Sequence, residues 1–240
     1  MRQLQLLNSE DAVQSWSVRQ SPRARRLSVR VFRHGGVEIV VPPRTSAQRV
    51  SAFVSEHREW IERQRLRSAP PIHWPLPPAS LALSALGEHW QCVPGGGRGR
   101  LHVRQIGESL LALEGDTSER ERLRHQLTRW LVQRAQACFE APLRSLAAQM
   151  GVSPGRLQVR CQRTRWGSCS RRGTISLNAC LLFQRPEVLH YLMVHELAHL
   201  KHMNHSTRFW NEVARHAPDW KTRDRELLQG WRRVPSWIFK

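Results

Sequence analysis

Residues 195–210 read HELAHLKHMNHSTRFW, and this stretch decides how the rest of the chain is interpreted. It contains the pattern H-E-x-x-H within a mostly apolar run, with His195 and His199 four residues apart. On a helix this spacing puts both imidazoles on one face, where they can share one cation. Glu196 lies about 100° around the helix from His195, so it can reach a metal-bound water without ligating the metal. The stretch therefore predicts a zinc site with a general base beside it.

A further histidine, His205, follows His199 after six residues and is the candidate third ligand. It can reach the metal only if the chain leaves the helix after about Lys201. Asn204 favours such an end, because asparagine tolerates the left-handed conformation. On a continuing helix His202 would lie about 10 Å along the axis from the start of the motif, too far for an ion held at about 2 Å. The predicted zinc ligands are His195, His199 and His205.

Other regular elements are predicted between residue 81 and the helix that carries the motif. Pro186 opens that helix, because its missing N–H has no partner in a first helical turn. The alternating pattern of short apolar runs predicts strands, and a long apolar face with a cap predicts a helix. The predicted elements are a small antiparallel sheet over 81–114, a long helix capped by Asp116 or Thr117, and strands over 157–162 and 174–177.

The N-terminal part is predicted to be a separate module. RLSVRVFRHGGVEIVV at 26–41 has two alternating runs around Gly35-Gly36, the pattern of a β-hairpin, and a helix should follow from Thr45 or Ser46 to about Arg67. Residues 68–80 contain five prolines, which favours a linker. We therefore expect a module over 1–67, a linker over 68–80 and an α+β metallohydrolase domain over 81–240.

Composition limits the classes of protein and of partner. Lys and Arg number 38 against 19 Asp and Glu, a formal net charge of +19, and residues 141–186 contain eight arginines but no acid. Two interpretations stay open: binding of an anionic substrate or nucleic acid, and a base-composition bias that enriches arginine.

Hydrophobic residues make up 40%, with no run long enough for a membrane span or signal peptide, so we expect a cytoplasmic protein with no membrane association. The five cysteines have no C-x-x-C pair and are expected to be reduced.

Three stretches of the chain together resemble a known family. RTRWGSCS at 163–170, GTISLN at 173–178 and HELAHLKHMNHSTRFW at 195–210 are similar to the YgjP-type metallopeptidase-like family, which is related to SprT-like and other gluzincin-like zinc proteins. The resemblance implies a zincin-like fold, with His195, His199 and His205 as zinc ligands and Glu196 as catalytic acid/base. The spacing also equals that of the metzincin pattern, but His202 stands at its glycine position and no methionine follows Met203 for a Met-turn.

The resemblance also implies that the segment from Trp166 to Cys169 lies near the site. An edge strand there could hold an extended substrate by backbone pairing, and Gly167 would permit close approach. The alternative is that Trp166 only packs against the helix and Cys169 fills a gap. Cys169 as a fourth ligand would close the coordination sphere and make the metal structural. The candidate substrate-binding residues are Arg165, Trp166, Gly167 and Ser168.

Three functions follow from these observations, in decreasing order of support. The first is a zinc-dependent metallopeptidase that acts on peptides. The second is a metal-dependent hydrolase of nucleotide phosphoanhydrides, suggested by the acid-free arginine-rich stretch. The third is a nucleic-acid-associated metal-binding protein, suggested by net charge alone. The oligomeric state cannot be read from the sequence.

Overall fold

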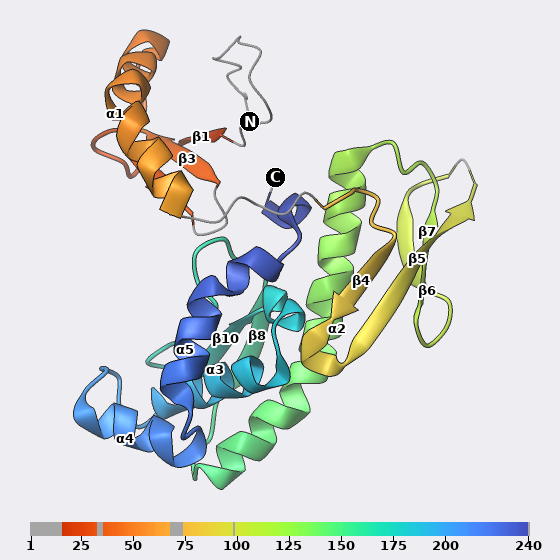
Figure 1. Cartoon of the computed structure of the whole chain (residues 1–240), viewed down its shortest axis with the longest axis vertical. Helices are drawn as coiled ribbons and strands as arrows, with labels where there is room; N and C mark the ends of the chain where they lie inside the picture. Colours follow the sequence, from red (N-terminus) through yellow and green to blue (C-terminus); the bar gives the residue numbers. More distant parts are fainter. Residues whose placement is uncertain (1–15, 33–35, 68–73, 98, 240) are drawn as a thin grey trace. The chain divides into compact units, whose positions relative to one another are not determined.

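The computed structural model describes residues 16–32, 36–67, 74–97 and 99–239 (Figure 1). The chain divides into two compact units, residues 1–72 with 239–240 and residues 73–238. The predicted turn residue Gly35 and the first six residues of the predicted linker lie outside the described residues. The boundaries predicted for the module, linker and domain therefore stay predictions.

The N-terminal unit has a three-stranded sheet and one helix. Its elements are β1 (Trp16–Gln20), β2 (Ser28–Val31), β3 (Val37–Val41) and α1 (Ala47–Arg67). The strand order is β1-β3-β2, with β2 antiparallel and β1 parallel to β3. Ile39 and Val41 of the sheet pack with Val50 and Val54 of the helix to form the core. The hydroxyl of Ser46 accepts the backbone N–H of Arg49, so the serine stabilises the start of the helix.

The second unit begins with a four-stranded sheet in the order β4-β5-β7-β6. Its elements are β4 (Ser80–Leu83), the 3₁₀ turn η1 (Ser84–Leu86), β5 (Glu88–Gly96), β6 (His102–Gln105) and β7 (Leu110–Glu114). The small antiparallel sheet predicted over 81–114 is wrong in one respect, because β5 and β7 are parallel. The hairpin of β6 and β7 inserts β7 beside β5, which leaves β6 at the edge. Alternation of apolar residues determines which face is buried, but not the direction of the neighbouring strand.

Helix α2 (Arg120–Gln149) runs between this sheet and a second, three-stranded sheet (Figure 1). Trp130 on the helix packs edge-on against Trp90 of β5, and Arg134 forms an ion pair with Glu88. The predicted cap at Asp116 or Thr117 is wrong. Asp116 Oδ1 instead accepts the N–H of Ser118 at 2.8 Å in the preceding turn, and the helix begins at Arg120.

The rest of the second unit carries the predicted site. Its elements are β8 (Arg156–Arg160), β9 (Gly167–Cys169), β10 (Thr174–Asn178), η2 (Ala179–Phe183), α3 (Pro186–Ala198), α4 (Thr207–His216), α5 (Trp220–Gln229) and η3 (Gly230–Arg233); η4 (Ser236–Phe239) ends the described chain. The strand order is β8-β10-β9, with β8 parallel and β9 antiparallel to β10. Helix α3 packs against α2, α4, α5 and the edge strand β9. The sheet edge and the helix with the motif are thus neighbours.

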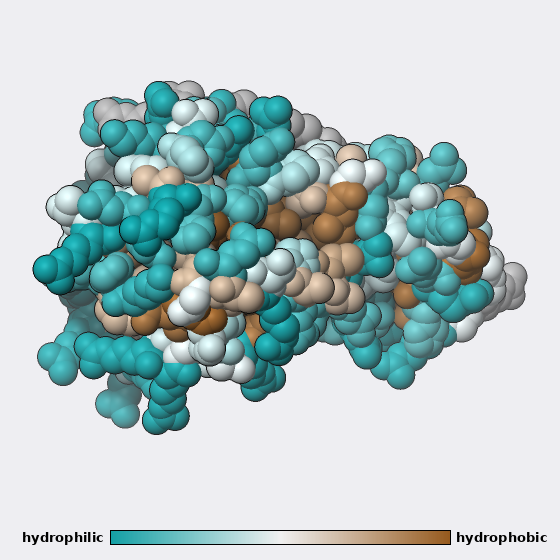
Figure 2. All heavy atoms as spheres, turned by 90° about the horizontal axis from the view of Figure 1, so that it is seen from below, coloured by the Kyte–Doolittle hydropathy of each residue, from teal (hydrophilic) through white to brown (hydrophobic). Residues whose placement is uncertain are grey.

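The surface and the thiols agree with the composition. Hydrophilic side chains cover most of the face shown in Figure 2, with apolar side chains in smaller patches between them. None of the helices over the described residues is long and apolar enough to cross a bilayer. All five cysteines are free thiols, of which Cys180 is buried and the other four are half-buried.

Candidate functional site

Helix α3 is apolar nearly all round, which explains why it lies inside the unit. It begins at Pro186, and between Val188 and Ala198 only His190 and His195 are not fully buried. A helix without a polar face must be covered on every side. The packing of α2, α4, α5 and β9 around it covers these side chains and carries the motif into a partly desolvated place.

The end of α3 determines where His205 lies. The helix ends at Ala198, whose carbonyl accepts the N–H groups of Lys201 and His202 at 3.1 and 2.9 Å, and α4 begins at Thr207. The chain therefore leaves the helix early, as a third ligand requires. The expected left-handed Asn204 is wrong, since Arg44 is the one non-glycine residue with positive φ in the described part of the chain. The tight turn at Ala198 ends the helix before Asn204 is reached.

The three predicted ligands meet at one point. Their nearest ring nitrogens all lie within 4.8 Å of one another, and Nε2 of His195 is 3.2 Å from Nε2 of His205. Two nitrogens bound tetrahedrally to one zinc at about 2.0–2.1 Å would be about 3.3 Å apart. Phe209 of α4 packs against all three rings, with centroid distances of 5.0, 4.6 and 4.7 Å to His195, His199 and His205. The donor set fits a zinc ion.

The other ring nitrogens have partners that orient two of the imidazoles. Nδ1 of His199 lies 3.2 Å from the carbonyl of His202, and Nδ1 of His195 lies 3.4 Å from the hydroxyl of Tyr191. Tyr191 in turn donates to Asp224 at 2.9 Å. With Nδ1 engaged, Nε2 of each ring is left for a metal. His202 thus acts through its backbone, which agrees with the prediction that its imidazole is no ligand.

Burial favours the neutral form of two of the candidate ligands, His195 and His199. Burial, followed by the charges of His199 and His205, lowers the pKa of His195 to about 3. Burial also lowers the pKa of His199, against the opposing hydrogen bond to the His202 carbonyl. Neutral imidazole is the form that binds a metal, so neither ring has to lose a proton near pH 7.

Glu196 is buried beside this cluster. Its side chain is 4% exposed, and Oε2 has no hydrogen-bond partner among the residues that the structure describes. Burial raises the pKa of Glu196 to about 8, although the charge of Arg165 opposes this. A buried carboxylate without partners is costly unless a cation or a ligand satisfies it. The orphaned oxygen therefore points to a cation and a water as the missing partners.

Gly167 is the closest neighbour of this carboxylate on β9. A Cβ atom added at Gly167 would lie 2.5 Å from Oε1 of Glu196, closer than real Cβ atoms come. The sequence indicated that Gly167 permits the close approach of a substrate backbone. In the structure the group that lies close to it is the side chain of Glu196. Absence of a side chain at Gly167 is what leaves room for the carboxylate.

The other candidate substrate-binding residues have different environments. Trp166 is 8% exposed and its ring stacks on Trp231 at a centroid distance of 3.9 Å, so its side chain packs against η3. Ser168 is half-buried on β9, and Arg165 precedes that strand and is exposed. Cys169 is not part of the group of possible ligands among the described residues, and burial with the nearby Glu196 raises its pKa to about 11.

Three residues near the site were not predicted from the sequence. Tyr191 precedes His195 by four residues, and this spacing alone could have placed it on the same helix face. Asp224 comes from α5 and has no such signal. Asn178, 1% exposed, accepts the N–H of Cys180 and donates to the carbonyls of Gln162 and Arg165, both at 2.8 Å. It fixes the segment that leads into β9.

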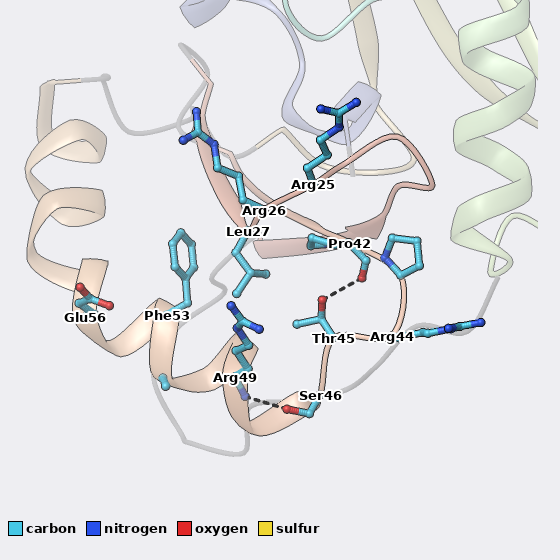
Figure 3. A pocket seen from close by; sticks show the side chains of 12 residues that line it. Arg25, Arg26, Leu27, Pro42, Arg44, Thr45, Ser46, Arg49, Phe53 and Glu56 are labelled. Atoms are coloured by element: carbon cyan, nitrogen blue, oxygen red, sulfur yellow. Dashed lines mark hydrogen bonds between the residues drawn. The ribbon is translucent and has the colours of Figure 1, made fainter.

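Two hollows lie outside the histidine cluster. One, of about 560 Å³, borders β9 in the second unit. The other, of about 690 Å³, lies in the N-terminal unit and is lined by Arg25, Arg26, Arg44 and Arg49 among others. Figure 3 shows these four guanidinium groups pointing in different directions around the hollow, with no common focus. It includes none of the predicted site residues.

Comparisons with known proteins give one family match and two partial structural similarities. The family model described as "YgjP-like, metallopeptidase domain" matches residues 25–229. No curated protein matches significantly. Two solved structures are similar over part of the chain. The metallopeptidase zymogen abylysin of Pyrococcus abyssi has 29% identity and a TM-score of 0.33, over 38% of this chain and 94% of abylysin. The metallopeptidase zymogen jannalysin of Methanocaldococcus jannaschii has 21% identity and a TM-score of 0.31, over 36% of this chain and 92% of jannalysin.

Proposed function

The chain belongs to the family of YgjP-like metallopeptidase domains, and from this premise we propose that it is a zinc-dependent peptidase with Glu196 as general base. The observation that carries the proposal is the convergence of three histidine nitrogens within 4.8 Å beside a buried, unpartnered carboxylate. Three imidazoles with one open position are the ligand set of many catalytic zinc sites. Other divalent ions also accept nitrogen ligands, but a site of three imidazoles with one open tetrahedral position is most typical of zinc.

His195, His199 and His205 would hold the metal. When bound, the zinc ion supplies a Lewis acid that polarises the peptide carbonyl and makes a water more acidic. The contacts of Tyr191 and His202 with the two Nδ1 atoms would hold the rings with Nε2 free for the ion. Phe209 blocks the side of the cluster that faces α4.

Glu196 would move the proton. Its carboxylate accepts a proton from the attacking water and passes it to the amine that leaves when the peptide bond breaks. Burial favours the first of these transfers, because it raises the pKa of the Glu196 carboxyl and so makes the carboxylate a better proton acceptor. The backbone of β9 would hold the peptide as an added strand, since β9 pairs only with β10 among the described residues.

Gly167→Ala is expected to lower the catalytic rate about ten- to a hundredfold, because the new methyl group would displace the Glu196 carboxylate by a few tenths of an ångström or more. Zinc content should not change, since no ligand moves. Gly107→Ala is the matched control: its nearest neighbour would be 3.8 Å away, in the loop between β6 and β7. The measurement compares the cleavage rate and the zinc stoichiometry of the two variants. A fully active Gly167→Ala variant would show that the position of Glu196 does not depend on the absence of a side chain at residue 167.

The substrate class is tested by an unbiased screen. The full chain loaded with one equivalent of zinc is incubated with a proteome-derived peptide library and, separately, with the nucleoside triphosphates. We expect new peptide termini and no release of phosphate. Release of phosphate or pyrophosphate without peptide cleavage would overturn the proposal in favour of a phosphoanhydride hydrolase.

A further inference from the structure

The hollow of about 560 Å³ lies on the outer face of the β8-β10-β9 sheet. Leu157 and Val159 of β8 are buried on the inner face, whereas Gln158 and Arg160 line the hollow. The same alternation holds on β10, where Ile175 and Leu177 are buried and Thr174 and Ser176 line it. The floor of the hollow is therefore the polar face of the sheet.

The charge of this hollow is purely positive. Arg160 and Arg165 are the charged residues in its lining, and the remaining lining side chains are hydroxyl, amide and thiol groups. Neither guanidinium takes part in an ion pair within residues 16–32, 36–67, 74–97 and 99–239. The sequence from residue 141 to 186 contains no acid that could neutralise them from within that segment. The charge of Arg165 also acts on the carboxyl of Glu196, but neither arginine has an ion-pair partner among the described residues. Hydroxyl donors beside two such guanidinium groups suit a carboxylate.

Both arginines are held at the same end of the sheet. Arg160 is in register with Asn178 on the neighbouring strand, and the Asn178 amide donates to the carbonyl of Arg165 at 2.8 Å. A second bond from this amide goes to the carbonyl of Gln162, between the two arginines in sequence. One buried asparagine thus fixes the backbone from which both side chains extend.

Strand β9 lies between the hollow and the proposed reaction centre, with one face toward each. Gly167 faces Glu196, whereas the next residue, Ser168, lines the hollow. Side chains of an extended peptide alternate between the two faces of a sheet. A peptide added beside β9 would therefore direct one side chain to the face of Glu196 and its neighbours over the hollow with Arg165.

We propose that this hollow is a specificity subsite that binds an aspartate or glutamate side chain of the peptide substrate, within about two residues of the bond that is cleaved, through Arg160 and Arg165. The inference rests on the proposed function, since it assumes a peptide beside β9. It adds a substrate class, acidic peptides, to the peptidase.

The test compares cleavage sites between variants. Zinc-loaded full-length protein is incubated with a proteome-derived peptide library, and the termini are identified by mass spectrometry. For the wild type we expect Asp and Glu to be enriched roughly tenfold near the cleaved bond, the effect of two partly exposed charge pairs. In Arg160→Gln/Arg165→Gln the ratio of acidic to neutral sites should fall to about one, whatever the total rate. Arg129→Gln, which removes the same charge from an exposed position of α2, should keep the wild-type ratio.

A binding measurement separates this inference from the proposed function. Fluorescein-labelled decapeptides with Glu or with Gln at alternate positions are titrated with zinc-loaded Glu196→Gln protein. Roughly tenfold tighter binding of the Glu peptide, lost in the double arginine variant and weakened by salt, supports the subsite even if no peptide is cleaved. Cleavage without acidic preference overturns the subsite and leaves the peptidase. Equal binding of both peptides, or a preference that survives loss of both arginines, also overturns it.

Discussion

Glu196→Gln is expected to lower the rate of peptide cleavage about a thousandfold while zinc binding stays stoichiometric. Glutamine has nearly the same shape as glutamate, so it fits beside Gly167, but it cannot accept the proton of the attacking water. The three ligand nitrogens belong to other residues and should hold the ion as before. Burial raises the pKa of Glu196 to about 8, so the metal-free site already holds mostly a neutral carboxyl near pH 7, and an amide of the same shape should leave thermal stability nearly unchanged.

The matched control for this variant is Glu187→Gln. Glu187 lies in the first turn of the same helix and is exposed, so the same chemical change there should alter the rate by less than about twofold. Initial rates on a peptide found in the screen, with zinc measured by elemental analysis, give the comparison. Equal rates for wild type and Glu196→Gln would exclude this carboxylate as the base.

His205→Ala is the second variant with a large expected effect. Loss of one of three protein ligands should weaken zinc binding more than a hundredfold, since even a residue that only orients a ligand contributes about ten- to a hundredfold. Cleavage at low micromolar zinc should disappear with the metal. Zinc should also raise the melting temperature of the wild type but not that of the variant, because zinc stabilises only a native state to which it binds.

His202→Ala is the informative comparison for this second prediction. His202 lies three residues before His205, and the bond it makes to His199 comes from its backbone carbonyl, which alanine keeps. The His202→Ala variant should therefore still bind one zinc ion per chain. Competition with a chromogenic chelator measures both affinities. Loss of zinc from His202→Ala with retention in His205→Ala would reverse the assignment of the third ligand.

The relative positions of the three histidines could be predicted from the sequence, because these residues belong to one helix and to the turn that follows it. The four-residue spacing of His195 and His199 needs only helical periodicity, and a third ligand at His205 needed only an early end to that helix. What ends it is different from the prediction: the carbonyl of Ala198 gathers two N–H groups, and Asn204 is not left-handed. Turn details of this kind depend on packing beyond the local residue types.

Long-range relations were less accessible. The parallel pairing of β5 with β7 could not be read from apolar alternation, which is the same for either direction. The hydrogen bonds from His195 through Tyr191 to Asp224 join α3 to α5, and the stack of Trp166 on Trp231 joins the segment before β9 to η3. Both depend on which elements become neighbours. The space at Gly167 was anticipated, but its occupant, Glu196, follows only from the contact of β9 with α3.

The most direct test of the metal centre is anomalous X-ray diffraction at the zinc edge on crystals of the full chain grown with one equivalent of zinc. We expect one strong peak about 2.0–2.1 Å from Nε2 of His195, His199 and His205, with a fourth position not filled by protein. A peak elsewhere, or a fourth ligand such as Cys169 Sγ that closes the coordination sphere, would contradict it.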